Sequence, residues 1–193
     1  GFLHKLGRDN LSDMLNSGKK FLKQKGHEGI YVVGAIANLL GKTMHTIPEY
    51  KTLGFDALTG YNFLPNFESK QAIQDYAELS TNLIKKWHKI YSMSNLPYIP
   101  SISLGWDATP RGTKIKSVED VISFPWSPIV INSNPENFGK NLSNGFDFIK
   151  QTNQNTIHLC SWNEWSEGAY LEPDTIYGLQ FLEKIKEIKS KKH

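Results

Sequence analysis

Apolar residues in this sequence alternate between two spacings, and this alternation is the feature that most restricts its fold. Nearly continuous apolar stretches at 29–38, 54–63, 98–107 and 155–163 are typical of buried strands. Around them, apolar residues recur every three or four positions, as in amphipathic helices. Buried strands that alternate with such helices predict a parallel sheet, which can be an open doubly wound sheet or a (β/α)8 barrel.

The helical spacing and its start signals divide the rest of the chain into helices. Apolar positions follow the helical period at 11–22, 73–91, 138–149 and 179–188. Start signals are expected at Asn134 before Pro135, at Asp174 before the last helix, and at Ser117 with Asp120 as a capping box. Strands and helices therefore alternate through the whole chain.

Three of the predicted strands end in polar and aromatic residues: TGYNF (59–63), GWDATPR (105–111) and WNEW (162–165). Such clusters favour the barrel, because catalytic groups gather at the carboxyl ends of barrel strands. A glycine-rich phosphate loop, which would favour the doubly wound sheet, follows none of the strands. We therefore predict an α/β fold of the (β/α)8 TIM-barrel type.

Only four strand and helix units are visible, whereas a complete barrel needs about 250 residues. We therefore treat residues 1–193 as a single domain that holds about the C-terminal four βα units, half of a barrel. Half a barrel leaves edge strands with unpaired backbone groups and an apolar inner face without a partner. An N-terminal half-barrel is accordingly expected upstream.

Composition argues against several classes of protein. The 193 residues are 39% hydrophobic, as in ordinary globular proteins, and no stretch approaches the ~18 consecutive apolar residues of a transmembrane helix. The net charge of +3 comes mostly from lysines spread along the predicted helices, and the chain has no basic stripe with stacking aromatics that would indicate nucleic acid. The histidines lack metal-ligand spacing, so no metal and no cofactor is expected.

Two further features bear on location. The single cysteine, Cys160, fits a reducing compartment and is expected to be buried. The first residues, GFLHKLGRDN, lack the apolar region of a signal peptide. A cytoplasmic location is expected.

Glu164 and Glu167 lie just beyond the last predicted strand and are three residues apart. Residues at this spacing point to opposite faces of a strand but to the same side of a helical or tight turn, so the chain is expected to turn here. Two neighbouring carboxylates repel each other unless one keeps a proton, which suits one of them to act as an acid. Glycosidic bond cleavage needs such a pair of carboxyl groups.

Aromatic residues flank this pair and support a sugar site. Trp162, Trp165 and Tyr170 lie within a few positions of the acids. Flat aromatic faces stack on the C–H faces of sugars and exclude water. The alternative is ordinary packing at the rim of the barrel, with surface acids that cap the last helix.

Arg111 is a second candidate. The chain has two arginines against twenty lysines, so an arginine in a strand-end loop suggests a need for its planar guanidinium. It could hold Asp107 and rigidify the loop, or bind a phosphate or an acidic sugar. Tyr61 and Asn62 could donate hydrogen bonds to sugar hydroxyls, or simply form a turn.

Two acidic residues are expected to have mainly structural roles. Asp56, inside the second predicted strand, is expected to contact the backbone. Glu172, next to Pro173, can be a helix N-terminal acid or a ligand group.

The run NEWSEGAYLEPD, together with GWDATPR, GFDALTGYNF and a final G-L-x-x-L helix, resembles the glycoside hydrolase family 99-like domain. It is closest to the WbsX-type branch, which is labelled glycosyltransferase and occurs among bacterial lipopolysaccharide and O-antigen biosynthesis proteins. The resemblance spans most of the chain and corresponds to the C-terminal half of the domain. It implies a (β/α)8 barrel, a bacterial source and action on glycans.

The resemblance also implies roles for the two acids. In the related hydrolases, the first Glu of N-E-W-x-E-G assists as a base at the 2-hydroxyl of the sugar, and the second is the general acid and base. These roles fall on Glu164 and Glu167. The substrate-binding residues expected around them are Trp106, Asp107, Arg111, Tyr61, Asn62, Asn163, Trp165 and Tyr170.

Hydrolysis and transfer both stay open. AYLEPD fits the WbsX-type branch rather than the hydrolases, Ala108 stands where a polar residue is expected, and no D-x-D signature of nucleotide-sugar binding occurs. We predict an enzyme acting on glycosidic bonds of α-linked glycans or of lipopolysaccharide O-antigen or capsule polysaccharide. The alternatives are a non-catalytic glycan-binding barrel and an inactive fragment of a longer enzyme.

Overall fold

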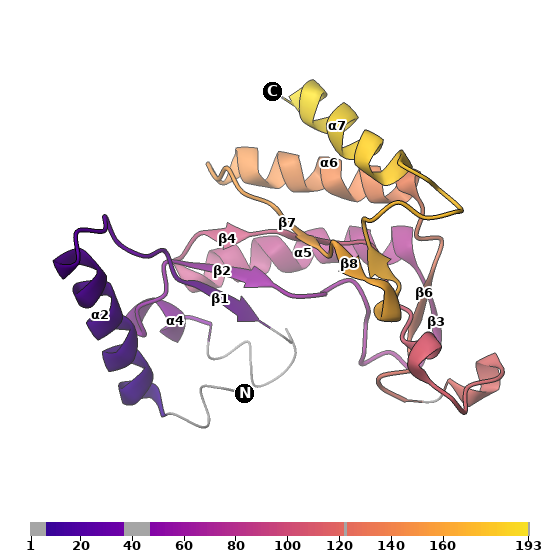
Figure 1. Cartoon of the computed structure of the whole chain (residues 1–193), viewed down its shortest axis with the longest axis horizontal. Coiled ribbons are helices and arrows are strands. Elements are labelled where there is room, and N and C mark those ends of the chain that lie inside the picture. Colours follow the sequence, from indigo (N-terminus) through magenta and orange to yellow (C-terminus); the bar gives the residue numbers. More distant parts are fainter. Residues whose placement is uncertain (1–6, 37–46, 122, 193) are drawn as a thin grey trace.

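Short parallel strands form the centre of the fold (Figure 1). The computed structural model describes residues 7–36, 47–121 and 123–192. The α-helices are α2 (Arg8–Gln24), α4 (Glu49–Thr52), α5 (Tyr76–Ser94), α6 (Pro135–Gln151) and α7 (Gln180–Lys192). The strands are β1 (Val33–Ile36), β2 (Ala57–Gly60), β3 (Ile73–Asp75), β4 (Tyr98–Ile99), β5 (Ser101–Ser103), β6 (Ile129–Ile131), β7 (His158–Cys160), β8 (Asn163–Glu164) and β9 (Ala169–Tyr170). Short 3-10 helices are η1 (Thr109–Arg111), η2 (Val118–Asp120) and η3 (Trp165–Glu167).

The four predicted strands pair with their chain neighbours. β1 pairs in parallel with β2, and β2 with β4. Only Pro100, which has no N–H to donate, separates β4 from β5, and its carbonyl accepts from the amide of His158 at 3.0 Å. β5 in turn pairs in parallel with β7. The order β1, β2, β4–β5, β7 lacks the reversal typical of a doubly wound sheet, and the described residues form no closed barrel.

Two short strand pairs lie outside the sequence prediction. β3 pairs in parallel with β6, and β8 pairs antiparallel with β9. β3 corrects the predicted start of the helix at 73–91, since Ile73 belongs to the strand. Asp75 then caps α5, accepting from the amides of Ala77 (2.8 Å) and Glu78 (3.2 Å). Strands this short contain too few residues for a periodicity to identify them.

Two of the predicted helix starts are confirmed. Asn134 Oδ1 accepts from the amide of Asn137 at 2.9 Å, which caps α6. Asp120 Oδ2 accepts from the amides of Lys116 (2.8 Å) and Ser117 (3.1 Å) around η2. Both side chains satisfy amides that lack a partner within the helix.

The predicted cap at Asp174 is wrong for the last helix, because α7 begins only at Gln180. Asp174 Oδ1 instead accepts from the amides of Ile176 (2.9 Å) and Tyr177 (2.5 Å). The same side-chain chemistry that caps a helix closes a tight turn here, and sequence alone does not distinguish the two.

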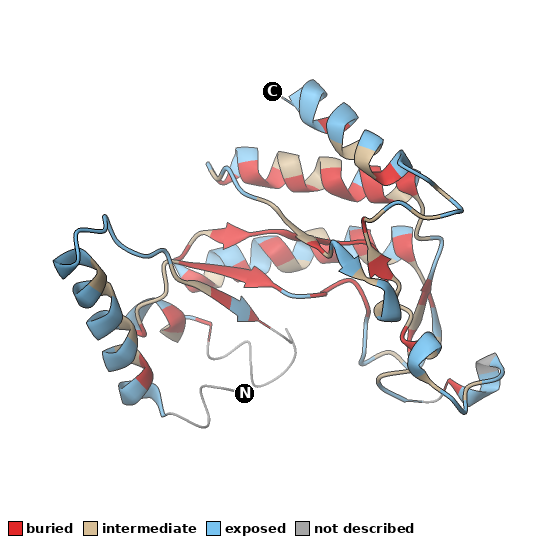
Figure 2. Cartoon of the chain, in the orientation of Figure 1, coloured by how far each residue is buried: buried red, intermediate tan, exposed pale blue. Residues whose placement is uncertain are grey.

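The core lies between the strands and helices α5 and α6 (Figure 2). Phe148 of α6 is 1% exposed, and its ring centroid lies 5.7 Å from that of Trp87 and 6.1 Å from that of Tyr98. α7 covers α6, with Phe181 against Phe138 at 5.5 Å (Figure 1). One apolar face of each of these helices is therefore buried, as their helical periods predict.

Helix α2 is attached to the strands through Lys19. Its Nζ donates to the carbonyl of Gly54 (2.8 Å) and to Asp56 Oδ1 (2.8 Å). Asp56 Oδ2 accepts from the amide of Val32 at 2.8 Å, which confirms the predicted backbone contact. Burial alone would raise the pKa of Asp56, but the hydrogen bonds from Lys19 and Val32 and the charge of Lys19 together lower this pKa.

Because the pKa of Asp56 is lower in the folded than in the unfolded chain, the contact stabilises the fold above the unfolded value of about 3.9. This contribution is lost as the pH falls through the folded-state pKa. Asp56→Asn is expected to lower the free energy of unfolding by about 0.5–1 kcal/mol near neutral pH and by less near about pH 3. Denaturant unfolding at the two pH values measures the difference. Asp13→Asn, on the exposed side of the same helix, is the control, and an equal loss at both pH values for Asp56→Asn would contradict the ion pair.

Phe148→Ala is expected to lower the free energy of unfolding by about 3–5 kcal/mol, because it leaves a cavity beside Trp87 and Tyr98. Denaturant unfolding followed by circular dichroism measures the loss. Phe21→Ala, at a ring that is 56% exposed on α2, is the matched control and should change stability by less than about 0.5 kcal/mol. Equal losses of stability in the two variants would mean that Phe148 does not belong to the core.

Candidate functional site

The carboxyl ends of β2, β5 and β7 meet, and the segments that follow them are in direct contact. Asp107, after β5, donates its amide to the carbonyl of Glu167, after β7, at 2.7 Å. Asn62, after β2, donates its side-chain amide to the carbonyl of Gly105 at 3.0 Å. The three segments that the sequence singles out therefore form one region at the ends of the parallel strands.

The predicted turn at Glu164 and Glu167 is present. β8 and β9 form an antiparallel pair joined by η3 and Gly168, and we call residues 164–168 the acid turn. Gly168 has a φ of 60°, in the left-handed region that favours glycine. A Cβ at Gly168 would lie 3.2 Å from the backbone nitrogen of Asp107, and a Cβ at Gly105 would lie 2.8 Å from the carbonyl oxygen of Gly168. The two glycines therefore let the acid turn and the 105–111 loop approach at backbone distance.

Arg111 crosses from this loop to the acid turn. Its Nη2 lies 3.1 Å from Oε1 of Glu167, and the two side chains are 41% and 16% exposed. The alternative pairing with Asp107 is wrong, because Asp107 Oδ1 accepts from the amide (2.9 Å) and the hydroxyl (2.6 Å) of Thr109 instead. Oε2 of Glu167 has no hydrogen-bond partner among the described residues. Glu167 is thus oriented by one oxygen and keeps the other available.

Glu164 is half-buried, and its carboxylate forms no hydrogen bond or ion pair within residues 7–36, 47–121 and 123–192. Neither Glu164 nor Glu167 caps the last helix, which begins at Gln180. The interpretation of the pair as helix-capping acids is therefore wrong. Polar groups that are shielded from water usually have protein partners, so an unpaired carboxylate at a strand end is available to a ligand.

Tyr61 directly follows β2, at the strand ends where the acid turn lies, and it is 51% exposed. Partial burial, followed by the neighbouring Cys160, raises the pKa of Tyr61. The negative charges of Glu167 and Glu164 raise this pKa further, whereas Arg111 lowers it. The Tyr61 hydroxyl is therefore within electrostatic reach of both carboxylates and of the guanidinium.

Trp165 and Tyr170 stack on each other, with ring centroids 3.8 Å apart and planes at 16°. Glu172 accepts from the indole nitrogen of Trp165, and Asp174 accepts from the Tyr170 hydroxyl at 3.0 Å. Partial burial and then this hydrogen bond raise the pKa of Tyr170 to about 12. Glu172 therefore orients an aromatic ring, and Trp165, still 44% exposed, keeps a surface open to solvent.

The other predicted residues are placed differently. Asn62 is buried, and besides its bond to Gly105 its Oδ1 accepts from the hydroxyl of Ser103 at 2.6 Å. It joins the strand ends, and both the nitrogen and the oxygen of its side-chain amide bond within the fold. Asn163 is exposed at the start of β8. Burial, more than the nearby carboxylates, raises the pKa of the Cys160 thiol to about 11, which agrees with the buried cysteine that the sequence predicts.

Sequence reasoning missed two aromatic residues of this region, Phe67 and Phe124. Both pack against Trp106, with ring centroids at 5.3 Å and 6.3 Å. We call these three residues the aromatic cluster. The indole nitrogen of Trp106 is buried and has no hydrogen-bond partner among the described residues. Both phenylalanines lie in irregular loops, where no periodic pattern signals such a contact.

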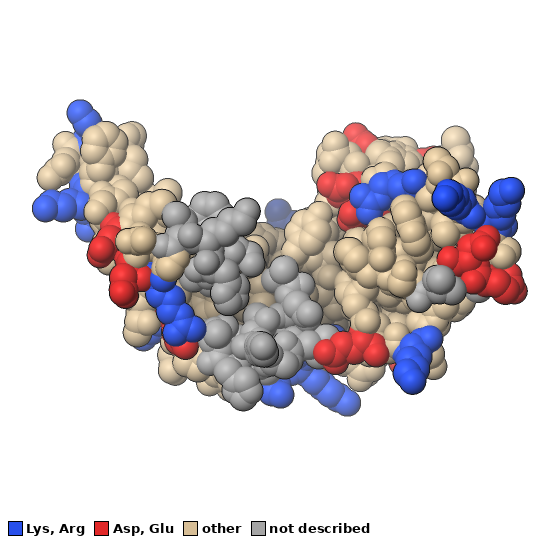
Figure 3. Space-filling view, turned by 90° about the horizontal axis from the view of Figure 1, so that it is seen from below, with Lys and Arg blue, Asp and Glu red and all other residues tan. Residues whose placement is uncertain are grey.

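Several other properties hold for the described ranges with their gaps at 37–46 and 122. They contain no group of three or more His, Cys, Asp or Glu residues arranged to hold a metal ion. None of their helices has the length and apolar character needed to cross a bilayer. Acidic and basic side chains are interspersed over the face seen in Figure 3.

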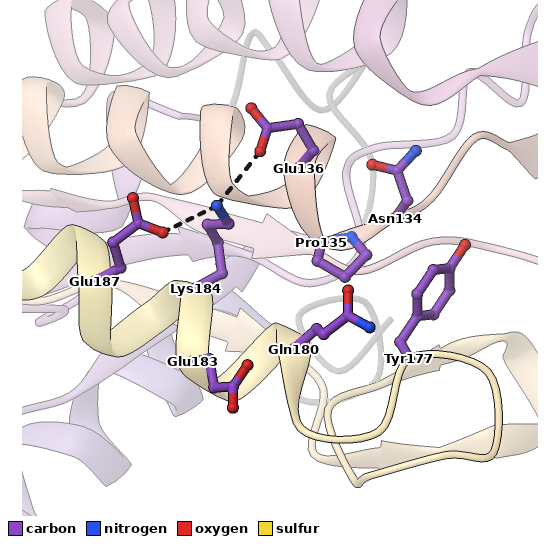
Figure 4. Close-up of a pocket in the computed structure, with 8 residues that line it drawn as sticks. All are labelled: Asn134, Pro135, Glu136, Tyr177, Gln180, Glu183, Lys184 and Glu187. Carbon is purple, nitrogen blue, oxygen red and sulfur yellow. Dashed lines mark hydrogen bonds and ion pairs between the residues drawn. The ribbon is translucent and has the colours of Figure 1, made fainter.

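A pocket of about 600 Å³ lies away from these residues, between the start of α6 and α7 (Figure 4). Lys184 lies inside it between Glu136 (3.3 Å) and Glu187 (2.9 Å). Its other lining residues are Asn134, Pro135, Tyr177, Gln180 and Glu183. None of the predicted site residues lines this pocket.

The family described as Glycosyltransferase WbsX matches residues 7–185. The chain belongs to this family, whose description names a glycosyltransferase. It is also similar to the uncharacterized protein WxcX of Xanthomonas campestris pv. campestris, in strain B100 and in strain ATCC 33913, with 22% identity over 161 residues. The match covers 70% of this chain and only 20% of each relative. No solved structure matches the chain.

Gly168→Ala is expected to lower the free energy of unfolding by more than the about 1–2 kcal/mol that a left-handed conformation costs an alanine, because the new Cβ also meets Asp107. Gly178→Ala is the matched control, since Gly178 has a φ of 55° and open space around its Cβ position. Denaturant unfolding compares the two variants. Equal losses would mean that the close approach of Gly168 and Asp107 contributes nothing.

Proposed function

We propose that this protein acts on glycosidic bonds of α-linked glycans, or of O-antigen or capsule polysaccharide, with Glu164 and Glu167 as its acid and base. The observation that carries the proposal is the convergence of unpaired polar groups on one turn. Glu164 and Oε2 of Glu167 have no partner in the described part of the chain, while Arg111 and Tyr61 approach from two other strand ends. An ion-pair network that serves only stability usually pairs more of its partly buried groups than this one does.

The arrangement suits Glu167 to exchange a proton with the glycosidic oxygen. Arg111 holds Oε1 in place, and Oε2 is open to substrate. A positioned carboxyl group of this kind protonates the leaving oxygen as its bond to the sugar breaks. The resemblance to the family 99-like hydrolases supports this role for Glu167.

Glu164 is suited to take a proton from the 2-hydroxyl of the same sugar, the role that the resemblance implies for it. Its unpaired carboxylate lies on the same short turn as Glu167. As O2 loses this proton it bonds to the anomeric carbon, the glycosidic bond breaks, and Glu167 delivers its proton to the leaving oxygen. Water then adds to the anomeric carbon as the bond to O2 breaks, Glu167 takes a proton from the water, and Glu164 returns its proton to O2. In a transfer reaction the same two groups would activate the hydroxyl of an acceptor glycan in place of water.

Aromatic side chains around the acids support a sugar as the substrate. Trp165 stacks on Tyr170 and donates its indole N–H to Glu172, so its ring is held in one orientation. Tyr61 adds an exposed ring with a hydroxyl. Rings held in this way stack on the C–H face of a pyranose without losing much side-chain entropy on binding.

We also propose that the described strands are part of a (β/α)8 barrel whose other strands come from an N-terminal half upstream. The order of the parallel strands along the chain supports this arrangement.

A non-catalytic glycan-binding protein is the second candidate. The exposed aromatic rings favour it, since Trp162, Tyr61 and Trp165 are 52%, 51% and 44% exposed. A binding protein needs such rings but does not need unpaired carboxylates. Mutation of the acids therefore distinguishes the two functions.

Glu167→Gln in the full-length protein is expected to lower turnover by about 10²–10⁴-fold, because the amide cannot donate or accept the catalytic proton. Turnover is measured as new reducing ends, or as label transferred to a fluorescent acceptor, from a panel of neutral α-linked oligosaccharides. Glu183→Gln, an exposed acid at the separate pocket of Figure 4, is the matched control and should keep full activity.

Near-normal turnover by Glu167→Gln would overturn the acid and base assignment. Oligosaccharide binding without any product from the unmutated protein would favour the non-catalytic alternative. Circular dichroism of each variant confirms that a loss of activity is not a loss of fold.

A further inference from the structure

The aromatic cluster of Phe67, Trp106 and Phe124 has features of a binding surface that the acid turn does not use. Phe67 meets both other rings, at 5.3 Å and 90° to Trp106 and at 5.4 Å and 77° to Phe124. Trp106 and Phe124 are nearly parallel, 6.3 Å apart with planes at 17°. The rings come from three loops that are distant in sequence, so the cluster is a product of the tertiary fold.

Much of this cluster faces solvent. Phe124 is 68% exposed and Phe67 is 40% exposed, whereas Trp106 beneath them is 6% exposed. Single exposed apolar residues are common on protein surfaces, but contiguous apolar side chains often mark binding sites. The buried indole nitrogen of Trp106 adds an N–H donor without an acceptor among the described residues.

The cluster adjoins the acid turn through the backbone. Gly105 and Asp107, the residues on either side of Trp106, make the close contacts with Gly168 and Glu167. The loop that carries Trp106 is therefore also the loop that contacts the acid turn.

We propose that the aromatic cluster is a subsite for a second, neutral sugar ring of the glycan, beyond the ring held beside Glu164 and Glu167. The proposal rests on the proposed function in that both sites take one glycan. The C–H face of a pyranose packs on the exposed rings of Phe124 and Phe67.

The chemistry of the cluster also sets the class of sugar. Two of its three rings are phenylalanines, which offer no hydrogen bond and no charge. An apolar surface of this kind disfavours the burial of a carboxylate and favours a methyl group. The subsite therefore prefers a 6-deoxyhexose over a neutral hexose, and a neutral hexose over a uronic acid.

The test measures affinity in the full-length protein carrying Glu167→Gln, so that turnover does not alter the ligands. The probes are methyl α-rhamnoside, methyl α-glucoside and linear α-linked rhamno- and gluco-oligosaccharides of increasing length, titrated by calorimetry. Phe124→Ala is expected to weaken binding of the longer oligosaccharides about tenfold and to leave the methyl glycosides unaffected. Phe124→Tyr keeps the ring and is expected to retain affinity, while Phe67→Leu should weaken it in the same direction. Phe21→Ala, an exposed ring on α2, is the control without effect.

The subsite would be overturned if the parent and Phe124→Ala had equal dissociation constants for every oligosaccharide. It would also be overturned if neither protein bound any of them measurably. Loss of self-association by Phe124→Ala without a change in sugar affinity would assign the cluster to contact between copies and would also overturn it. Product formation by the protein with Glu167 intact is scored separately. Binding in the expected pattern without product formation would support the subsite and overturn the enzymatic function. Product formation without any effect of Phe124→Ala on binding would support the enzymatic function and overturn the subsite.

Discussion

The close backbone approach between the 105–111 loop and the acid turn is the constraint on which the rest of the site depends. The amide of Asp107 donates to the carbonyl of Glu167 at 2.7 Å, and the absence of a Cβ at Gly105 and Gly168 makes this distance possible. With the two backbones in contact, Arg111 reaches Glu167 although they are 56 residues apart in sequence. The position of the acid turn is therefore set mainly by contacts between backbones, which cost less side-chain entropy than a contact between two long side chains.

The polar residues of the region divide by whether the protein uses them. The side chains of Asn62, Asp107 and Glu172 accept or donate hydrogen bonds within the fold, and each of them holds another part of the site in place. Glu164, by contrast, has no partner in the described part of the chain, and Glu167 uses only one of its oxygens. The neighbouring groups that are fixed within the fold therefore leave Glu164 and one oxygen of Glu167 available to a ligand.

Much of the fold follows from local patterns in the chain. β1, β2, β4–β5 and β7 fall within the predicted apolar stretches, and the apolar faces of α5, α6 and α7 follow the helical period. β3 and β6 do not follow, because each has three residues and exists through pairing with the other. Asp174 shows a second limit. Its hydrogen bonds to two following amides are those of a helix cap, but the chain around Gly178 does not continue into a helix at that point.

For the candidate site, the sequence by itself determined the turn at Glu164 and Glu167 and the segments that carry Arg111 and Tyr61, because residue type, spacing and position after a strand are local properties. Only the tertiary structure decided which residues these side chains contact. It paired Arg111 with Glu167 rather than Asp107, buried Asn62 against Gly105 and Ser103, and brought Phe67 and Phe124 together on Trp106. These contacts join segments that are far apart along the chain, and their geometry depends on how the strands are ordered and how closely two glycines let the loops approach.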